Sequence, residues 1–164
     1  MQQEILDDKS QCASVGGAIE CCVVGMPGGL GSPDFGCNVE GILSQYLFAV
    51  PAVKAVAFGT GFGFASMRGS QANDPIYCDG GIVRTRTNHT GGINGGITNG
   101  MPILFTVAMR PTPSIAQPQE TISLSTGAPA ELVIHGRHDP CIVHRAVPVI
   151  EAACALAMCQ ILGI

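Results

Sequence analysis

Apolar and polar positions divide this sequence into two helices and several short strands. Between residues 39 and 50, apolar side chains recur every three or four positions, the period of a helix with one buried face. Asn38 is a typical N-cap, and Pro51 would end this helix. Residues 147–162 are apolar on nearly every side, which predicts a helix buried all round, with Pro148 in its first turn and a C-terminal stop at the glycine that follows.

Runs of β-branched residues bounded by glycine or proline predict the strands. The expected strands span residues 14–25, 52–58 and 102–109, with a hairpin over 75–87 and a second strand pair at 121–124 and 131–135. The hairpin over 75–87 would turn at Asp79-Gly80-Gly81. Mixed strands and two helices without a βαβ repeat favour an α+β fold, an antiparallel sheet with packed helices in one domain over residues 1–164.

Residues 86–114 are the most distinctive stretch of the chain. Five of the ten residues from Gly91 to Gly100 are glycine, and the strand that follows ends in Arg110-Pro111-Thr112-Pro113-Ser114. The two prolines would hold the two hydroxyl residues in a stiff, extended loop. A cation, hydroxyls and nearby glycine amides could together bind a phosphate. A simple glycine-rich turn between strands explains the glycines equally well.

The composition of the chain bears on which partners it could have. The chain is 46% hydrophobic and only 12% charged, so we expect much of its surface to be covered by a partner subunit or by further chain. A net charge of −4 disfavours nucleic acid as the main partner. The apolar segment 146–164 contains Pro148, Glu151 and Gln160, which favours a helix inside a protein over a membrane span.

The eight cysteines do not form the pattern of a disulfide framework. Cys21 and Cys22 are adjacent, and Cys154 and Cys159 lie in the apolar helical run. We therefore expect reduced, mostly buried cysteines in a cytoplasmic protein.

Residues 135–144 carry the clearest cluster of reactive side chains. His135, His138, Cys141 and His144 recur every third residue and are all zinc-type ligands, but Pro140 breaks the helix that would align them. We therefore expect no metal site here. Within the same stretch, Arg137 and Asp139 could form a structural ion pair, or bind an anion and orient a proton donor.

Several common enzyme motifs are missing from the sequence. There is no Gly-x-Ser-x-Gly elbow, no phosphate-binding loop of the Walker type and no dinucleotide fingerprint. The sequence shows no nicotinamide site that would assign an NADP-dependent flavin reductase activity.

Seven motifs, in order and in register, resemble the C-terminal half of chorismate synthases. They are Ser14-Val-Gly-Gly17, Met67-Arg-Gly-Ser-Gln-Ala-Asn-Asp74, Arg86-Thr-Asn-His-Thr-Gly-Gly-Ile93, Gly95-Gly-Ile-Thr-Asn-Gly100, Arg110-Pro-Thr-Pro-Ser114, Gly136-Arg-His-Asp-Pro-Cys141 and Arg145-Ala-Val-Pro148. The family's Gly-Asp-Ser-His-Gly and Gly-Pro-Gly-His segments, which hold its two catalytic histidines, do not occur in these 164 residues.

This resemblance implies a lyase of the shikimate pathway, which makes aromatic amino acids. The family eliminates phosphate and a proton from 5-enolpyruvylshikimate 3-phosphate to give chorismate, and it requires reduced FMN. It also implies a homotetramer of β-α-β sandwiches, of which this chain would supply one sheet and part of the helical layer. We expect the 164 residues alone to be inactive; the alternative is a non-catalytic flavin- or phosphate-binding or structural fragment.

The resemblance also assigns site residues by position. The family's FMN contacts fall on Pro51, Ala52, Gly95, the run Arg110, Pro111, Thr112, Pro113 and Ser114, and Arg137. Asp139 corresponds to an aspartate near the flavin for which a role in proton relay has been proposed. No catalytic role is transferred to the chain's four histidines. The sequence departs from the family's pattern at Arg110, usually lysine, and at Thr90 and His144, usually alanine and proline.

Overall fold

The largest sheet is built around one central strand. In this computed structural model, which describes residues 2–164, β7 (Ile103–Met109) pairs antiparallel with β1 (Gly17–Val23) on one side and with β2 (Val53–Phe58) on the other. Every second side chain of β7, from Ile103 to Met109, is buried, and the residues between them are half-buried. The sheet therefore has one face inside the core and one open face.

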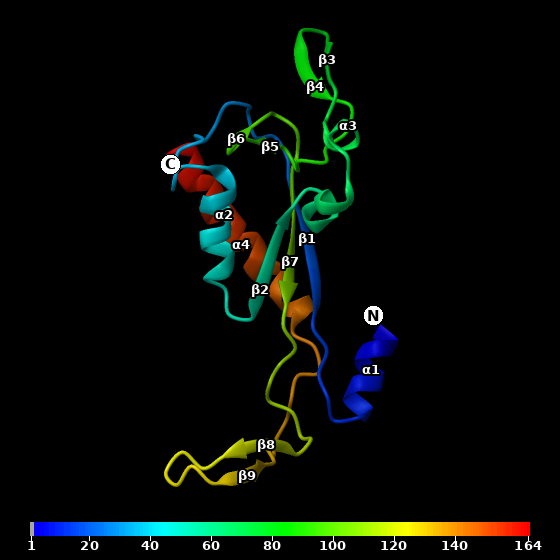
Figure 1. Cartoon of the computed structure of the whole chain (residues 1–164), viewed down its shortest axis with the longest axis vertical. Helices are drawn as coiled ribbons and strands as arrows, with labels where there is room; N and C mark the ends of the chain where they lie inside the picture. The colour runs from blue at the N-terminus through cyan, green and yellow to red at the C-terminus, as the bar shows by residue number, and fades with distance from the viewer. Residues whose placement is uncertain (1) are drawn as a thin grey trace.

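Two helices cover the inner face of the sheet (Figure 1). They are α2 (Val39–Phe48) and α4 (Val143–Leu162), which pack on each other, α2 also against β2 and α4 also against β1. Asn38 caps α2, as predicted, because its side chain accepts a hydrogen bond from the backbone N–H of Gly41. One continuous core joins both helices to the sheet, with Leu43, Phe105 and Ile150 almost fully buried. The α+β class is confirmed.

The final helix differs from its prediction in two ways. It begins at Val143, four residues earlier than expected, so Pro148 lies in its second turn and not its first. The first turn forms because the Ile142 carbonyl accepts hydrogen bonds from the backbone N–H groups of Arg145 and Ala146. Pro148, which has no backbone N–H to donate, comes only after this turn is complete. Gly163 ends the helix in the left-handed region, as predicted.

The helix is also not buried all round. Val147, Val149 and Leu156 are exposed, because no other element in residues 2–164 covers that side of α4. By length and composition alone α4 could cross a membrane, a test that the core helix of a globular protein also passes. Its packing on α2 and β1 makes it a core helix with one open side.

Two hairpins project from opposite ends of the molecule (Figure 1). The first joins β3 (Ile76–Asp79) to β4 (Ile82–Thr85) through Gly80 and Gly81, as predicted. The second joins β8 (Gln119–Ile122) to β9 (Pro129–Leu132), each strand beginning two residues before its predicted position. The shift arises because the turn spans residues 123–128 and is closed by the Gly127 N–H on the Ser123 carbonyl.

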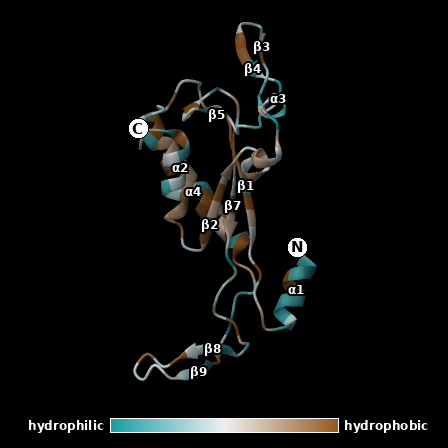
Figure 2. Ribbon diagram, viewed as in Figure 1, coloured by the Kyte–Doolittle hydropathy of each residue, from teal (hydrophilic) through white to brown (hydrophobic). Residues whose placement is uncertain are grey.

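Five short elements were not predicted. They are α1 (Gln2–Ser10), the 3-10 helix η1 (Gly61–Ser66), α3 (Gly69–Ala72), β5 (Ile93–Asn94) and β6 (Ile97–Thr98). Helix α1 buries none of its residues and is mostly hydrophilic (Figure 2), so it has no apolar period to detect. The glycine-rich stretch forms the tight hairpin of β5 and β6. These glycines therefore form a turn between strands, one of the two explanations that the sequence left open.

All eight cysteines are free, but the expectation that most are buried is wrong. Cys141 and Cys154 are buried and Cys21 is half-buried, whereas the other five are exposed. Cys22, for example, alternates with Cys21 on β1 and so faces away from the helices.

The core makes a direct prediction for stability. Leu43→Ala should lower the free energy of unfolding by about 2–5 kcal/mol, because the side chain is fully buried and its removal leaves a cavity. Leu6→Ala, the same substitution at an exposed site on α1, should change it by less than about 0.5 kcal/mol. Urea unfolding followed by circular dichroism measures both; similar losses would contradict this description of the core.

Candidate functional site

The end of β7 brings two predicted site segments together. The backbone N–H of Arg110, the first residue after β7, donates to the carbonyl of Ala52 at 2.9 Å. Ala52 has a φ of 74°, a left-handed conformation that is unusual for a residue with a side chain. The Pro51-Ala52 turn and the Arg110 run therefore lie side by side, held by a backbone that accepts local strain.

The chain before β1 fastens this end of the sheet to the loop that precedes α4. The Ser14 hydroxyl donates to the Thr112 carbonyl at 2.6 Å, and the backbone N–H of Val15 donates to the Pro140 carbonyl at 2.8 Å. A Cβ atom at Gly16 would lie 2.5 Å from the Met109 carbonyl oxygen, so only glycine allows this close approach. The Arg110–Ser114 run and the loop around Pro140 are thereby joined.

His138 makes a second connection between the same two segments. Its Nδ1 lies 3.0 Å from Ser114 Oγ, and its Nε2 lies 3.1 Å from the carbonyl oxygen of Ile134. Ser114 precedes the β8–β9 hairpin in the chain and His138 follows it. The bond between these two side chains therefore joins the two ends of the segment that contains the hairpin.

Polar groups at this end of the sheet are left without partners. Thr112 Oγ1 is buried and has no hydrogen-bond partner within residues 2–164. Arg110 and Arg137 are both exposed, and neither guanidinium group pairs with an acid in that part of the chain. A buried hydroxyl without a partner normally costs stability, so this group is a candidate for a bond to something outside residues 2–164.

Asp139 pairs with Arg145, and the expected pairing with Arg137 is wrong. Arg145 Nη1 lies 2.6 Å from Asp139 Oδ2, because the first turn of α4 places Arg145 over the loop that holds Asp139. Arg145 also lines a hollow of about 370 Å³ with Pro51, Met109, Ile142 and apolar residues of α4. This volume falls within the range of small-molecule sites.

Gly95 lies apart from the other predicted contacts. It forms the β5–β6 turn, which precedes β7, whereas Arg110 follows β7. A strand of seven residues separates the two ends by about 23 Å. The glycine amides therefore do not lie beside the Arg110 run. The hypothesis that both bind one phosphate is wrong for this chain. Asn94, next to Gly95, lines a separate polar hollow of about 540 Å³ beside the β3–β4 hairpin.

The cluster of zinc-type ligands is dispersed in the fold. Cys141 is buried in the core, His138 bonds to Ser114 and Ile134, and His135 and His144 are exposed. Among residues 2–164, no three histidine, cysteine or acidic side chains gather as metal ligands.

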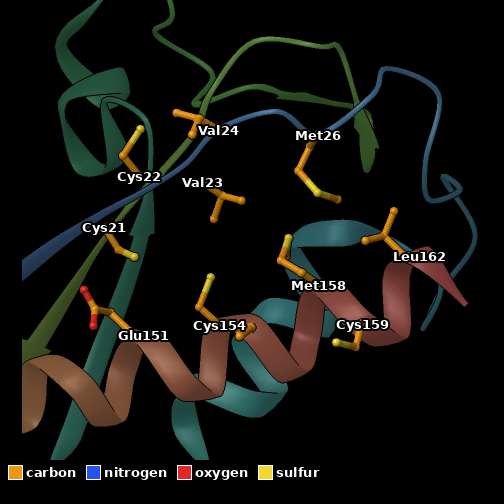
Figure 3. A pocket seen from close by; sticks show the side chains of 11 residues that line it. Cys21, Cys22, Val23, Val24, Met26, Glu151, Cys154, Met158, Cys159 and Leu162 are labelled. Atoms are coloured by element: carbon orange, nitrogen blue, oxygen red, sulfur yellow. The ribbon is translucent and has the colours of Figure 1, made fainter. Parts of the chain in front are cut away.

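A sulfur-rich hollow of about 420 Å³ lies toward the other end of α4, between that helix and the residues at the end of β1 (Figure 3). The thiols of Cys21 and Cys154 both line this hollow. Burial, followed by the charge interaction with Cys21, raises the pKa of Cys154 to about 12, and burial also raises the pKa of Cys21. Both groups are therefore protonated thiols and poor nucleophiles.

Comparison with known proteins decides the family. The family model for chorismate synthase matches residues 1–162. The chain belongs to the chorismate synthase family. It is 47% identical over 158 residues to chorismate synthases of Opitutus terrae and Thermococcus gammatolerans, covering 96% of this chain but 43% and 44% of those proteins. A crystal structure of chorismate synthase matches with a TM-score of 0.79 and 31% identity, over 98% of this chain and 41% of that one.

Chorismate synthase relatives are thus more than twice as long as this chain. The family and its motifs are recognisable from the sequence, but the bonds by which Ser14, His138 and Arg145 connect these motifs are not. The contacts made by Ser14 and His138 span 98 and 24 positions in the sequence, so no local signal reveals them. The Arg145–Asp139 pair spans six positions, but it depends on where the first turn of α4 begins.

Asp74 is another residue whose role the sequence did not show. Its carboxylate accepts hydrogen bonds from the backbone N–H groups of His89 and Thr90 and from the hydroxyls of Thr87 and Thr90. Burial alone would raise the pKa of Asp74, but these bonds outweigh it and lower the pKa to about 2. Asp74 therefore links its own motif, Met67–Asp74, to the Arg86–Ile93 motif.

This pKa predicts a pH dependence. The folded value is below the ordinary 3.8, so ionised Asp74 stabilises the fold above about pH 4, and this stability is lost as the pH falls toward about 2. Asp74→Asn should lower the urea midpoint at about pH 5, and its difference from the wild type should shrink at lower pH. Asp79→Asn in the exposed β3–β4 hairpin is the matched control. A difference that is constant with pH would contradict this role.

Proposed function

We propose that this chain forms the FMN-binding part of a chorismate synthase active site. The observation that carries the proposal is the buried, unpartnered Thr112 hydroxyl, in a pair of joined segments that also carry two unpaired arginines, Arg110 and Arg137. Hydroxyl and guanidinium donors are the groups that bind phosphate monoesters. Pro51 and the apolar residues of α4 add a wall suited to a flat ring.

The residues present fit reduced FMN on chemical grounds. Thr112 and Ser114 offer hydroxyls, and Arg110 and Arg137 offer positive charge for its phosphate or for an anionic substrate. When bound, reduced FMN would supply transient electron donation to a reaction with no net redox change. Gly95, about 23 Å from Arg110 along β7, is too far from Arg110 to bind the same phosphate group.

The reaction we propose is the trans-1,4-elimination of 5-enolpyruvylshikimate 3-phosphate. The bond between carbon and the phosphate oxygen breaks, a hydrogen is removed, and chorismate and phosphate are formed. Arg137 would hold the anionic substrate or cofactor. Asp139 would take part in proton movement, since Arg145 orients Oδ2 and no residue within 2–164 bonds to Oδ1.

Catalysis would need the remainder of the family protein, in a homotetramer. The chain spans about 43% of its relatives and corresponds to their C-terminal portion, and its 164 residues contain neither histidine segment. We therefore propose an enzyme activity for the assembly and none for this chain alone. No observation supports a purely structural fragment better, because the unpartnered Thr112 hydroxyl and the two unpaired arginines indicate a ligand.

Cofactor binding tests the proposal most simply. Flavin fluorescence should report FMN binding to the 164-residue chain, and Arg137→Ala should weaken binding on the order of 10–100-fold by removing a charge-assisted bond to the ligand. Arg84→Ala, at an exposed arginine of the β3–β4 hairpin, should bind like the wild type. Equal weakening by both substitutions would show that only net charge matters.

Turnover tests the reaction itself. With reduced FMN and 5-enolpyruvylshikimate 3-phosphate, the chain alone should form no chorismate. Together with the remaining portion of a family protein it should form chorismate, and Asp139→Asn should slow that turnover by about 100-fold or more. Chorismate formation by the chain alone, or full activity of Asp139→Asn, would contradict the proposal.

A further inference from the structure

The two bonds of His138 fix which of its ring nitrogens carries hydrogen. The Ile134 carbonyl oxygen, 3.1 Å from Nε2, can only accept a hydrogen bond, so Nε2 must carry a hydrogen atom. In a neutral imidazole the other nitrogen, Nδ1, is then an acceptor. Ser114 Oγ, 3.0 Å from Nδ1, must therefore donate its only hydrogen to His138.

This arrangement makes Ser114 unsuitable for an anion while His138 is neutral. A serine hydroxyl has one hydrogen, and that hydrogen is used on Nδ1. The oxygen would then present only lone pairs to a phosphate. If Nδ1 takes a proton from solvent, both ring nitrogens donate, Ser114 accepts from Nδ1, and the hydroxyl hydrogen is released to bind a phosphate oxygen.

Several charged residues belong to the segments that His138 joins. Arg137 and Asp139 are its neighbours in the same loop, Arg145 of α4 pairs with Asp139, and Arg110 begins the segment that contains Ser114. Because Arg145 already pairs with Asp139, a bound phosphate would be the new negative charge beside the ring. A phosphate group would therefore favour the protonated imidazole.

We propose that His138 is a positioning residue that sets the hydrogen-bond direction of Ser114, so that a phosphate monoester binds there together with one proton on His138 Nδ1. This inference rests on the proposed function, in which the Arg110–Ser114 run holds the phosphate of FMN. It gives His138 a role that does not require contact with the reacting atoms.

Nitrogen NMR of the histidine-labelled chain tests this directly. His138 is assigned among the four histidines by the loss of its signals in His138→Gln. The neutral ring of the free chain should show hydrogen on Nε2 and none on Nδ1. Saturating FMN should move Nδ1 to the protonated position, whereas riboflavin, which lacks the phosphate, should leave it bare. A free chain with hydrogen on Nδ1, or FMN binding that leaves Nδ1 bare, would overturn the proposal.

Binding measurements supply an independent readout. His138→Gln can still accept from Ser114 but cannot gain the proton, so the ratio of wild-type to variant FMN affinity should rise about 10-fold between pH 8 and pH 6. Taking this ratio at each pH cancels the titration of the FMN phosphate itself. His144→Gln, at an exposed histidine of α4, should give a constant ratio. A constant ratio for His138→Gln would also overturn the proposal.

The same experiment separates this inference from the proposed function. If FMN changes neither the fluorescence nor the spectrum, the FMN proposal fails, and inorganic phosphate then serves as the probe of the Ser114 site. Phosphate should still protonate His138 Nδ1. Binding of phosphate without that change would overturn the role of His138.

Discussion

The structure depends on the pairing of β7 with a strand on each side. Because β1 and β2 both hydrogen-bond to it, the register of β7 fixes which side chains enter the core and which stay on the open face. The same pairing sets the position of the segments at its two ends. Arg110 and its neighbours leave one end against the Pro51-Ala52 turn, and the β5–β6 hairpin precedes the other. The candidate site at the Arg110 end is therefore positioned by that strand.

The candidate site combines rigid backbone with open side chains. Ser14, Val15 and His138 hold the two candidate segments in place through bonds of 2.6–3.0 Å. The side chains of Arg110, Thr112 and Arg137 make none of these bonds: the two arginines are exposed, and the Thr112 hydroxyl is buried without a partner in residues 2–164. This division suits a site that binds and orients a cofactor. Because the backbone is already ordered in the free chain, little conformational entropy is lost when a ligand binds. The uncovered side of α4 fits a chain that spans 43% of its relatives.

The fold was largely predictable because its main elements have clear local signals. The helix capped by Asn38 and the strand from Ile103 to Met109 follow directly from apolar periodicity. The polar helix α1 and the early start of α4 could not be predicted in this way, because neither shows a periodic pattern of apolar side chains. At the site, the family resemblance supplied the residues, but the Arg145–Asp139 pair and the separation of Gly95 from Arg110 arise from tertiary packing. Only the three-dimensional arrangement reveals them.

Hydrogen–deuterium exchange with and without FMN tests the central claim most directly, since it locates the ligand on the chain. The account predicts slower exchange of the backbone N–H groups at Arg110, Thr112, Ser114 and residues 137–139 when FMN is present. The β3–β4 hairpin and the sulfur-rich hollow beside Cys154 should be unaffected. Binding of FMN with protection confined to those other regions, and none at the Arg110–Ser114 run, would contradict the account.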